Sequence, residues 1–286
     1  MKISQNVAPV SVIIPSYRCA STIGRAVDSV FVQSIIPFEI ILVEDCSGDE
    51  TLATLQELER AYPGRMKIVK MERNQGAASA RNAGWAIATQ PYIAFLDADD
   101  SWHPEKLRIQ YEYIRNNPDV VLCGHQCVLL HNSETPSVLL QNLHATKISS
   151  GSLLLKNAFS TPTVMLKRDI SFRFLDGKRC AEDLLLWQQI AFGGFQVVRL
   201  ESPLAYVHKP LYGAGGLSAQ LWEMEKGELS NFIFLYKLGA IGLQLYVAAT
   251  FFSSIKFIRR LFFVKVLYFI KFLRIKFYEL MGLSNY

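Results

Sequence analysis

The sequence predicts an α/β protein in which a mostly parallel central sheet is covered by helices on both faces and is followed by a helical C-terminal tail. Three observations predict this. Short β-branched runs alternate with helix-like segments through residues 11–115, polar residues follow those runs directly, and the composition changes near residue 228. Strands and helices that alternate with short connections are typical of a parallel sheet.

The first half of the chain predicts four strands in succession. Each is a short apolar run bounded by turn-forming residues, and each is followed by a segment with helical spacing of apolar positions. The predicted strands are residues 11–14, 38–43, 66–71 and 92–96; the predicted helices begin at Ser21 or Thr22 and cover residues 51–62, 76–88 and 103–115.

Polar side chains stand where each of these four strands ends. In a parallel sheet the carboxyl ends of the strands share one edge, and ligands bind beyond that edge. We therefore expect one site to collect the following residues: Ser16 and Tyr17, Glu44 and Asp45, Asn74, and Asp97, Asp99 and Asp100.

The remaining chain divides into a second lobe and a tail. Residues 119–212 hold short runs with turn residues and one clear helix at 181–191, which predicts a lobe packed on the same sheet. We expect one domain over residues 1–227, with halves at about 1–118 and 119–227, and a hydrophobic and basic tail over residues 228–286.

Charge is distributed unevenly along the 286 residues. The net charge is +5, but seven basic residues and no acidic one lie between Lys256 and Lys276, and the rest of the chain holds 23 Lys and Arg against 25 Asp and Glu. The sequence therefore gives no support to a nucleic-acid-binding surface on the body. An odd count of five cysteines favours reduced thiols; zinc at Cys123, His125 and Cys127 is the less favoured alternative to ordinary burial.

The segment FLDADD, residues 95–100, carries the clearest chemical signal. A buried strand delivers three carboxylates within four residues, and like charges this close are stabilised by a cation. A few hard oxygen ligands suit Mg²⁺ or Mn²⁺ shared with substrate phosphates. The alternative is an acidic turn in which Asp100 or Ser101 caps the next helix.

Two further segments fit a nucleotide. A carboxylate in VEDCSGD, residues 43–49, can accept the ring N–H of a pyrimidine base, although Asp49 also suits a helix cap. In NQGAASARNAG, residues 74–84, small side chains permit close approach and Arg81 offers a planar fork of donors to a diphosphate. A merely close-packed helix is the alternative for that segment.

Together these segments resemble family 2 glycosyltransferases, whose catalytic domain has the GT-A fold. The matching pieces, in the family's order and spacing, are VIIPSY at 12–17, VEDCSGD at 43–49, NQG to Gly84 at 74–84, LDADD at 96–100 and AEDL at 181–184 before a helix containing Trp187. The resemblance covers about residues 10–215. One departure is Glu44, where the family commonly has a second aspartate.

The resemblance implies an inverting transfer of a sugar from a nucleotide-diphosphate donor, expected to be UDP-linked, to an acceptor hydroxyl. Residues 1–118 would be the nucleotide-binding half and residues 119–227 the acceptor half. The implied donor-binding residues are Pro15, Tyr17, Asp45, Arg81 and Asp97; Asp99 would bind Mg²⁺ or Mn²⁺, and Asp183 would be the general base. Glu44, Glu182 and His208 are further candidates; His208 with the glycines of 213–216 would close over the diphosphate, or would be a structural histidine.

The tail predicts contact with a membrane surface through residues 229–281. Residues 238–255 carry no charge, and the following helical stretch places Lys256, Arg259, Arg260, Lys271 and Arg274 on one face. A peripheral or monotopic enzyme on the cytoplasmic face of the inner membrane, acting on a lipid-linked saccharide in cell-surface polysaccharide synthesis, fits this pattern. A spanning helix over residues 232–255 is the alternative.

Two other functions compete with this interpretation. A nucleotidyltransferase also combines a parallel sheet with a metal, but the segment after the first strand, PSYRC at 15–19, is not a glycine-rich phosphate loop. A catalytically inactive, membrane-bound module that binds nucleotide sugars is the second alternative. The presence of Asp97, Asp99 and Asp183 together disfavours it.

Overall fold

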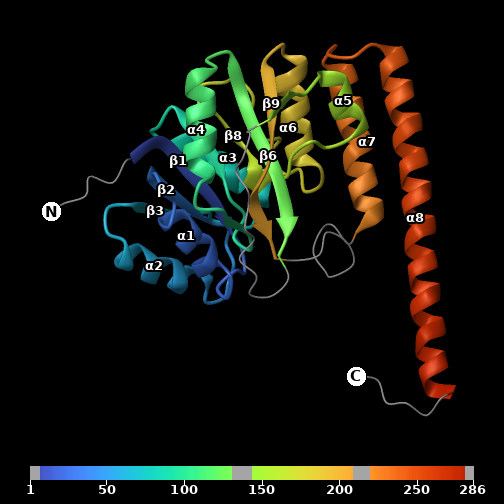
Figure 1. The fold of residues 1–286 in the computed structure, drawn as a ribbon, viewed down its shortest axis with the longest axis horizontal. Helices are drawn as coiled ribbons and strands as arrows, with labels where there is room; N and C mark the ends of the chain where they lie inside the picture. The colour runs from blue at the N-terminus through green and yellow to red at the C-terminus, as the bar shows by residue number, and fades with distance from the viewer. Residues whose placement is uncertain (1–6, 131–143, 209–219, 281–286) are drawn as a thin grey trace.

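The computed structural model describes residues 7–130, 144–208 and 220–280, with the backbone alone for 264–280. One mixed sheet forms its centre, with helices on both faces (Figure 1). The strand order is β3-β2-β1-β4-β8-β6-β9-β5, and β7 pairs with β9. The strands are β1 (Val7–Ser16), β2 (Ile36–Glu44), β3 (Met66–Lys70), β4 (Tyr92–Phe95), β5 (Ser101–Trp102), β6 (Val120–Leu129), β7 (Ala145–Lys147), β8 (Met165–Lys167) and β9 (Gln196–Val207).

The helices also follow the predicted order through the first half. They are α1 (Ile23–Phe31), α2 (Thr51–Ala61), α3 (Ala77–Ile87), α4 (Lys106–Asn116), α5 (Ser150–Leu155), α6 (Glu182–Phe192), α7 (Leu221–Lys237) and α8 (Leu243–Leu280), with a 3-10 turn η1 (Thr161–Thr163). Four strands, β3-β2-β1-β4, are parallel, and β8 joins β4 in the antiparallel direction. The predicted central sheet with helices on both faces is therefore confirmed, but it is mixed rather than mostly parallel: β6 and β9 pair in parallel, whereas β8 also pairs with β6, and β9 with β5 and β7, in the antiparallel direction.

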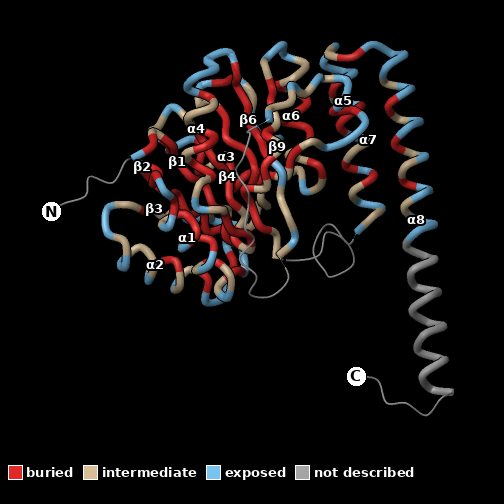
Figure 2. Tube along the Cα trace, viewed as in Figure 1, coloured by how far each residue is buried: buried red, intermediate tan, exposed pale blue. Residues whose placement is uncertain are grey.

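Alternation along β1 explains why the sheet is covered on both faces. Val12 and Ile14 belong to a core with α1, α2 and α4, whereas Ile13 belongs to a core with α3 and α6. Side chains along a strand alternate between faces, so a run of β-branched residues fills both cores at once. Figure 2 shows the buried residues concentrated in the sheet and its adjoining helices.

Gly84 permits α3 to lie close to the sheet. A Cβ atom at this position would stand 2.6 Å from Cγ2 of Ile13 and 3.1 Å from Cγ2 of Val43. Because such a contact is shorter than van der Waals packing allows, a larger residue would push α3 away from β1 and β2. The small residues of this segment thus set the place of Arg81, which lies on the same helix.

The carboxyl ends of the parallel strands meet at one edge of the sheet. Ser16 pairs with Glu44, and Glu44 in turn pairs with Lys70. The Asp45 N–H donates to the Ser16 carbonyl at 2.9 Å, and Leu96 N–H donates to Ile13 at 3.1 Å. The register therefore aligns the loops that follow β1, β2, β3 and β4.

The tail is a helical hairpin of α7 and α8, and α8 extends beyond the body of the protein (Figure 1). The boundary expected between residues 227 and 228 falls within α7. Gly239, with φ of 74°, lies in the turn between the two helices, and Tyr236 stacks on Tyr246 across it at 5.2 Å.

The hairpin divides residues 232–255 between two helices, so the single spanning helix considered for this stretch does not form. No helix in the described part of the chain combines the length and apolar character needed to cross a membrane.

Candidate active site

Asp45 organises the loop that follows β3. Its carboxylate is buried and accepts the backbone N–H groups of Gln75 and Gly76, both at 2.8 Å, and the side-chain amide of Asn74 at 3.0 Å. Two sequence-predicted segments, 43–49 and 74–84, are thereby joined around one carboxylate.

The side chain of Glu44 bonds to a different loop from that of Asp45, although the two residues are adjacent in sequence. Its Oε1 accepts the Ser47 N–H at 2.6 Å, and this bond closes the turn after β2. Asp49 Oδ1 accepts the Thr51 N–H at 2.9 Å in the turn that leads into α2, but the N-cap residue of this helix is Glu50, so the helix-cap interpretation of Asp49 is wrong. Pro15 lies near the end of β1 opposite Val43, and Tyr17, just beyond, is 44% exposed.

Arg81 links the segment after β4 to the start of α6. Its guanidinium is buried and forms ion pairs with Asp97 at 2.8 Å and with Glu182 at 3.0 Å. Burial alone would lower the pKa of Arg81, but the charges of Asp97 and Glu182 outweigh it and raise the pKa. Two carboxylates far apart in the sequence are therefore held on one permanently charged group.

Asp183 is the second residue of α6 and lies beside this ion pair. Its Oδ2 lies 3.3 Å from the Asn157 amide and 3.4 Å from the Thr161 hydroxyl, while Oδ1 accepts the Leu184 N–H at 2.6 Å. Burial and the charge of Glu182 raise the pKa of Asp183 to about 6. A carboxylate with this pKa is ionised at neutral pH and basic enough to take a proton.

The three carboxylates after β4 crowd together. Burial and the charges of Asp97 and Asp99 raise the pKa of Asp100 to about 8. Arg25 donates to the Asp99 carbonyl at 2.6 Å, and Ser101 lies 2.8 Å from Nε2 of His208. His208 thus stands beside this segment, whereas residues 213–216, expected to close with it, lie outside the described residues.

This carboxylate group fits a divalent cation that shares its ligands with a phosphate. No set of three or more Asp, Glu, His or Cys side chains in the described ranges is arranged as a metal cage. A cation bound through one or two carboxylates and completed by substrate oxygens needs no such cage. Burial is the larger cause of the raised pKa of Asp100, and the charges of Asp97 and Asp99 add to it; a bound cation would relieve the part that these charges contribute.

The helix-cap alternative for Asp100 and Ser101 does not apply. Strand β5 (Ser101–Trp102) lies between these aspartates and α4, which begins at Lys106. Trp102 instead donates its indole N–H to the Pro162 carbonyl at 2.8 Å, and Gln110 donates to the Thr163 carbonyl at 2.9 Å. These bonds fix η1, whose Thr161 faces Asp183.

Backbone strain concentrates at the same edge. Within the described ranges, three residues other than glycine have positive φ: Arg18 at 47°, Cys46 at 55° and Ala181 at 54°. Arg18 follows β1, Cys46 follows β2 and Ala181 precedes α6. Each is therefore next in sequence to a predicted site residue. Strain of this kind persists where surrounding contacts enforce it, and it is frequent at functional sites.

Family and fold comparisons agree with this geometry. The model of the family "Glycosyl transferase family 2" matches residues 11–172, which is more than half of the chain. The chain belongs to glycosyltransferase family 2. This membership favours glycosyl transfer over the nucleotidyltransferase alternative.

Relatives of this family 2 chain come from bacterial glycan assembly. It is 31% identical over 185 residues, 63% of this chain and 69% of the relative, to the Escherichia coli enzyme WfgD, named UDP-Glc:alpha-D-GlcNAc-diphosphoundecaprenol beta-1,3-glucosyltransferase. Among solved structures, S. aureus TarS 1–349 with UDP-GlcNAc has a TM-score of 0.63 at 19% identity, covering 79% of this chain and 66% of that one.

A second solved neighbour is the mannosyltransferase PcManGT of Pyrobaculum calidifontis, determined with GDP-Man and Mn²⁺. Its TM-score is 0.62 at 18% identity, covering 85% of this chain and 69% of that one. At these identities the two structures show that the family 2 chain shares the GT-A fold.

Several residues at this site escaped sequence analysis. Arg25 and Asn157 contact the predicted groups from α1 and from the segment after α5. Arg179 lies beside Gly76, 3.9 Å from the point where a Cβ of that glycine would stand. None of the three lies in a matched motif, and only the proximity of their segments in the fold reveals them.

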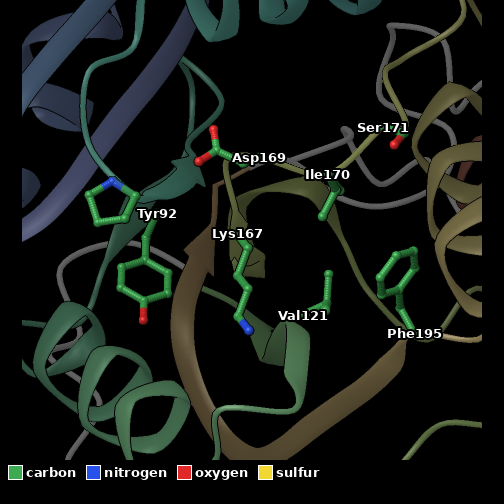
Figure 3. A pocket seen from close by; sticks show the side chains of 8 residues that line it. Tyr92, Val121, Lys167, Asp169, Ile170, Ser171 and Phe195 are labelled. Atoms are coloured by element: carbon green, nitrogen blue, oxygen red, sulfur yellow. The ribbon is translucent and has the colours of Figure 1, made fainter.

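Two other features lie apart from the site. Cys123 and His125 are buried in the core, as the preferred interpretation of that segment expects. A cavity of about 430 Å³ opens at the opposite end of β4, where Tyr92, Lys167, Asp169 and Phe195 are among its lining residues (Figure 3). Because β4 leads away from this cavity toward Asp97, the cavity is separate from the transferase site.

Proposed function

We propose that this protein is an inverting, metal-dependent glycosyltransferase that uses a UDP-linked sugar. Asp45, together with the loop after β3 that it holds, would bind the nucleotide base of the donor. Pro15 and Tyr17 would border the same pocket. Asp97 would contact the ribose or the sugar. The name of WfgD, with UDP-Glc as donor, and the UDP-GlcNAc complex of TarS support a UDP-linked donor.

In this proposal Arg81 has two roles: it contacts the diphosphate, as its sequence motif predicts, and it also holds two carboxylates in place. Two of its nitrogens are engaged by Asp97 and Glu182, and Nε has no protein partner. The guanidinium would hold the donor-side and acceptor-side carboxylates at a fixed separation. Its positive charge would also face the diphosphate as the bond to the sugar breaks.

Asp99 would hold Mg²⁺ or Mn²⁺ with the donor diphosphate. When bound there, the cation would neutralise charge that develops on the leaving diphosphate. The Mn²⁺ in the PcManGT complex supports this cofactor for the fold.

Asp183 would act as the general base. The acceptor hydroxyl oxygen bonds to the anomeric carbon as the bond from that carbon to the diphosphate oxygen breaks, and the hydroxyl proton moves to Asp183. A single displacement of this kind inverts the anomeric carbon. The observation that carries the proposal is the ion-pair bridge Asp97–Arg81–Glu182, because it brings the donor motif next to the base.

The acceptor would be a lipid-linked saccharide, as the name of WfgD states for that relative. The hairpin supports a membrane location, because Val247, Phe251, Ile255, Ile258 and Phe262 recur every three or four residues and are all exposed on α8. We propose peripheral attachment of this apolar stripe at the cytoplasmic face of the membrane.

One basic residue of the tail differs from its expected position. Lys256 was expected among the residues facing lipid head groups, but its amine pairs with Glu228 at 2.6 Å and donates to the Leu155 carbonyl at 2.9 Å. Lys256 therefore joins α8 to the body, and the membrane proposal depends on the apolar stripe more than on this charge.

The experiment that tests the proposed function is a donor panel on the full chain. Purified protein is mixed with UDP-, GDP- and TDP-linked sugars and a lipid-linked sugar-diphosphate acceptor, with Mn²⁺ or with chelator. We expect a UDP-linked sugar to be transferred with inversion, read by NMR of the product. Transfer with retention, or transfer from a different nucleotide class only, would reject the corresponding part of the proposal.

A further inference from the structure

The strained residue Ala181 stands immediately before the Glu182–Asp183 pair. Its φ of 54° is left-handed, a conformation that costs a residue with a Cβ about 1 kcal/mol. Its carbonyl accepts the Leu185 N–H at 3.1 Å and so begins α6. The direction in which Asp183 leaves the backbone therefore depends on keeping Ala181 in this conformation.

The contacts that hold Ala181 come from α7. Asn231 is completely buried on that helix, and its side-chain amide donates to the Ala181 carbonyl at 2.9 Å. This carbonyl thus has two donors, one from the helix it begins and one from the hairpin. A buried amide placed on a strained peptide is a specific restraint, because moving either partner leaves a buried donor unsatisfied.

The backbone of α7 touches the same segment. A Cβ at Gly227 would lie 2.7 Å from the carbonyl oxygen of Cys180 and 2.8 Å from its Cβ, so only glycine admits this approach. Lys178 adds two bonds, to the Gly227 carbonyl at 3.1 Å and to the Ser230 hydroxyl at 2.6 Å. Residues 178–181 are therefore held along one face of α7.

We propose that Asn231, supported by the close approach at Gly227, is a positioning residue for Asp183, so that α7 forms part of the acceptor side of the site. This inference rests on the proposed role of Asp183 as the base. On this inference α7 contributes to catalysis, although the expected boundary between domain and tail, at residues 227 and 228, falls within this helix.

The same contacts connect the apolar stripe on α8 to the base. Ser253 donates to Glu225 at 3.0 Å, and Lys256 pairs with Glu228, so α8 is joined to α7 along one face. From α8 the chain of contacts runs through α7 to Ala181 and Asp183. A truncation within α7, such as one after residue 228, would therefore remove Asn231 and impair transfer as well as membrane binding.

The test is a double-mutant cycle on the full chain. Asn231→Ala removes the restraint, and Ala181→Gly removes the strain that the restraint opposes, since glycine adopts positive φ readily. We expect Asn231→Ala to lower kcat by about tenfold while the donor KM changes by less than about twofold, because the base and not the donor pocket is misplaced. Lys226→Ala, at an exposed position on α7, is the matched control.

The second half of the cycle separates positioning from a general loss of stability. In the Ala181→Gly background we expect Asn231→Ala to lower kcat by less than about threefold. The acid limb of the kcat–pH profile should also move to lower pH in Asn231→Ala alone, because a loosened Asp183 is better solvated. Asn231→Leu keeps the side-chain volume without the donor, and it serves if the alanine variant does not fold.

A folded Asn231→Ala or Asn231→Leu enzyme with wild-type kcat and an unchanged pH profile would overturn the inference. Asp183→Asn is measured beside it to separate the two claims. If Asp183→Asn still transfers sugar, the proposed base is wrong; if it is inactive while the Asn231 variants are fully active, only the positioning role fails.

Discussion

Arg81 and Glu182 lie 101 positions apart in the chain, and their side chains form an ion pair of 3.0 Å. The same guanidinium pairs with Asp97, which follows β4. One buried arginine on α3 therefore holds Asp97 close to the start of α6. Substituting it should affect folding and catalysis together.

Arg81→Met should destabilise the fold by about 3 to 5 kcal/mol, because Asp97 and Glu182 would lose their shared cation. Arg81→Lys should retain more stability but lose most transfer, since a single ammonium cannot bridge both carboxylates in the geometry of the planar fork. Urea unfolding and transfer assays measure the two effects. Arg115→Lys, at an exposed position on α4, is the control, and equal stability of all three variants would refute the bridge.

The kcat of transfer should fall on the acid side with a midpoint near pH 6. The pKa of Asp183 is raised to about 6, so the base is protonated and inactive below that pH. Asn157→Ala should move this limb to higher pH, because the Asn157 amide favours the ionised carboxylate. A limb that stays in place in the Asn157 variant would assign the titration to another group.

Asp183→Asn should abolish transfer, keep donor binding and raise stability at neutral pH. The pKa of Asp183 is about 6 in the fold against 3.8 in its ordinary state, so ionisation lowers stability as pH rises through that window. A neutral amide removes this cost, and we expect a gain of up to about 3 kcal/mol above pH 6. Thermal unfolding at two pH values checks the sign, and an equal gain on both sides of the window would contradict it.

Chelation should suppress transfer, and added Mn²⁺ or Mg²⁺ should restore it. Asp99→Asn should require a much higher concentration of cation for half-maximal rate, because one hard anionic ligand is lost. Asp49→Asn is the matched control, since the Asp49 carboxylate bonds to the Thr51 N–H in the turn before α2 and its loss should leave the cation requirement unchanged. Full activity of the wild type in chelator would remove the metal from the mechanism.

Replacing Phe251 and Phe262 by serine should release the protein from vesicles. These side chains are 67% and 70% exposed, and each contributes about 2 kcal/mol when buried in an apolar phase. Flotation with phosphatidylglycerol–phosphatidylcholine vesicles measures binding, and Phe38→Ser, an exposed phenylalanine on β2, is the control. Undiminished flotation of the double variant would assign membrane contact elsewhere.

The order of elements was predictable because each strand and helix has its own local pattern. The run at residues 38–43 became β2, and the small-residue segment at 76–88 became α3. The meeting of Asp45 with Asn74 was expected in outline, since both follow neighbouring parallel strands.

Contacts that depend on the packing of distant segments were not predictable. Glu182 and Arg81 lie on different helices, α6 and α3, and no local pattern predicts that their charges meet. The amide of Asn231 reaches Ala181 only because Gly227 lets α7 approach residue 180. A lone glycine within a helical segment does not predict which other segment packs against it. The break at residues 238–242 coincides with Gly239 and Gly242, but glycine within an uncharged stretch does not by itself distinguish a helix break from a continuous helix.

The central claim is that Asp45, Asp99 and Asp183 border one bound donor. A crystal structure of the full chain with UDP and Mn²⁺, with the metal located by its anomalous signal, tests this most directly. We predict the manganese on the Asp99 carboxylate and the diphosphate, the uracil beside Asp45, and Asp183 facing the position of the sugar. Nucleotide bound elsewhere, for example in the cavity beside Tyr92, with no metal at Asp99, would contradict the account.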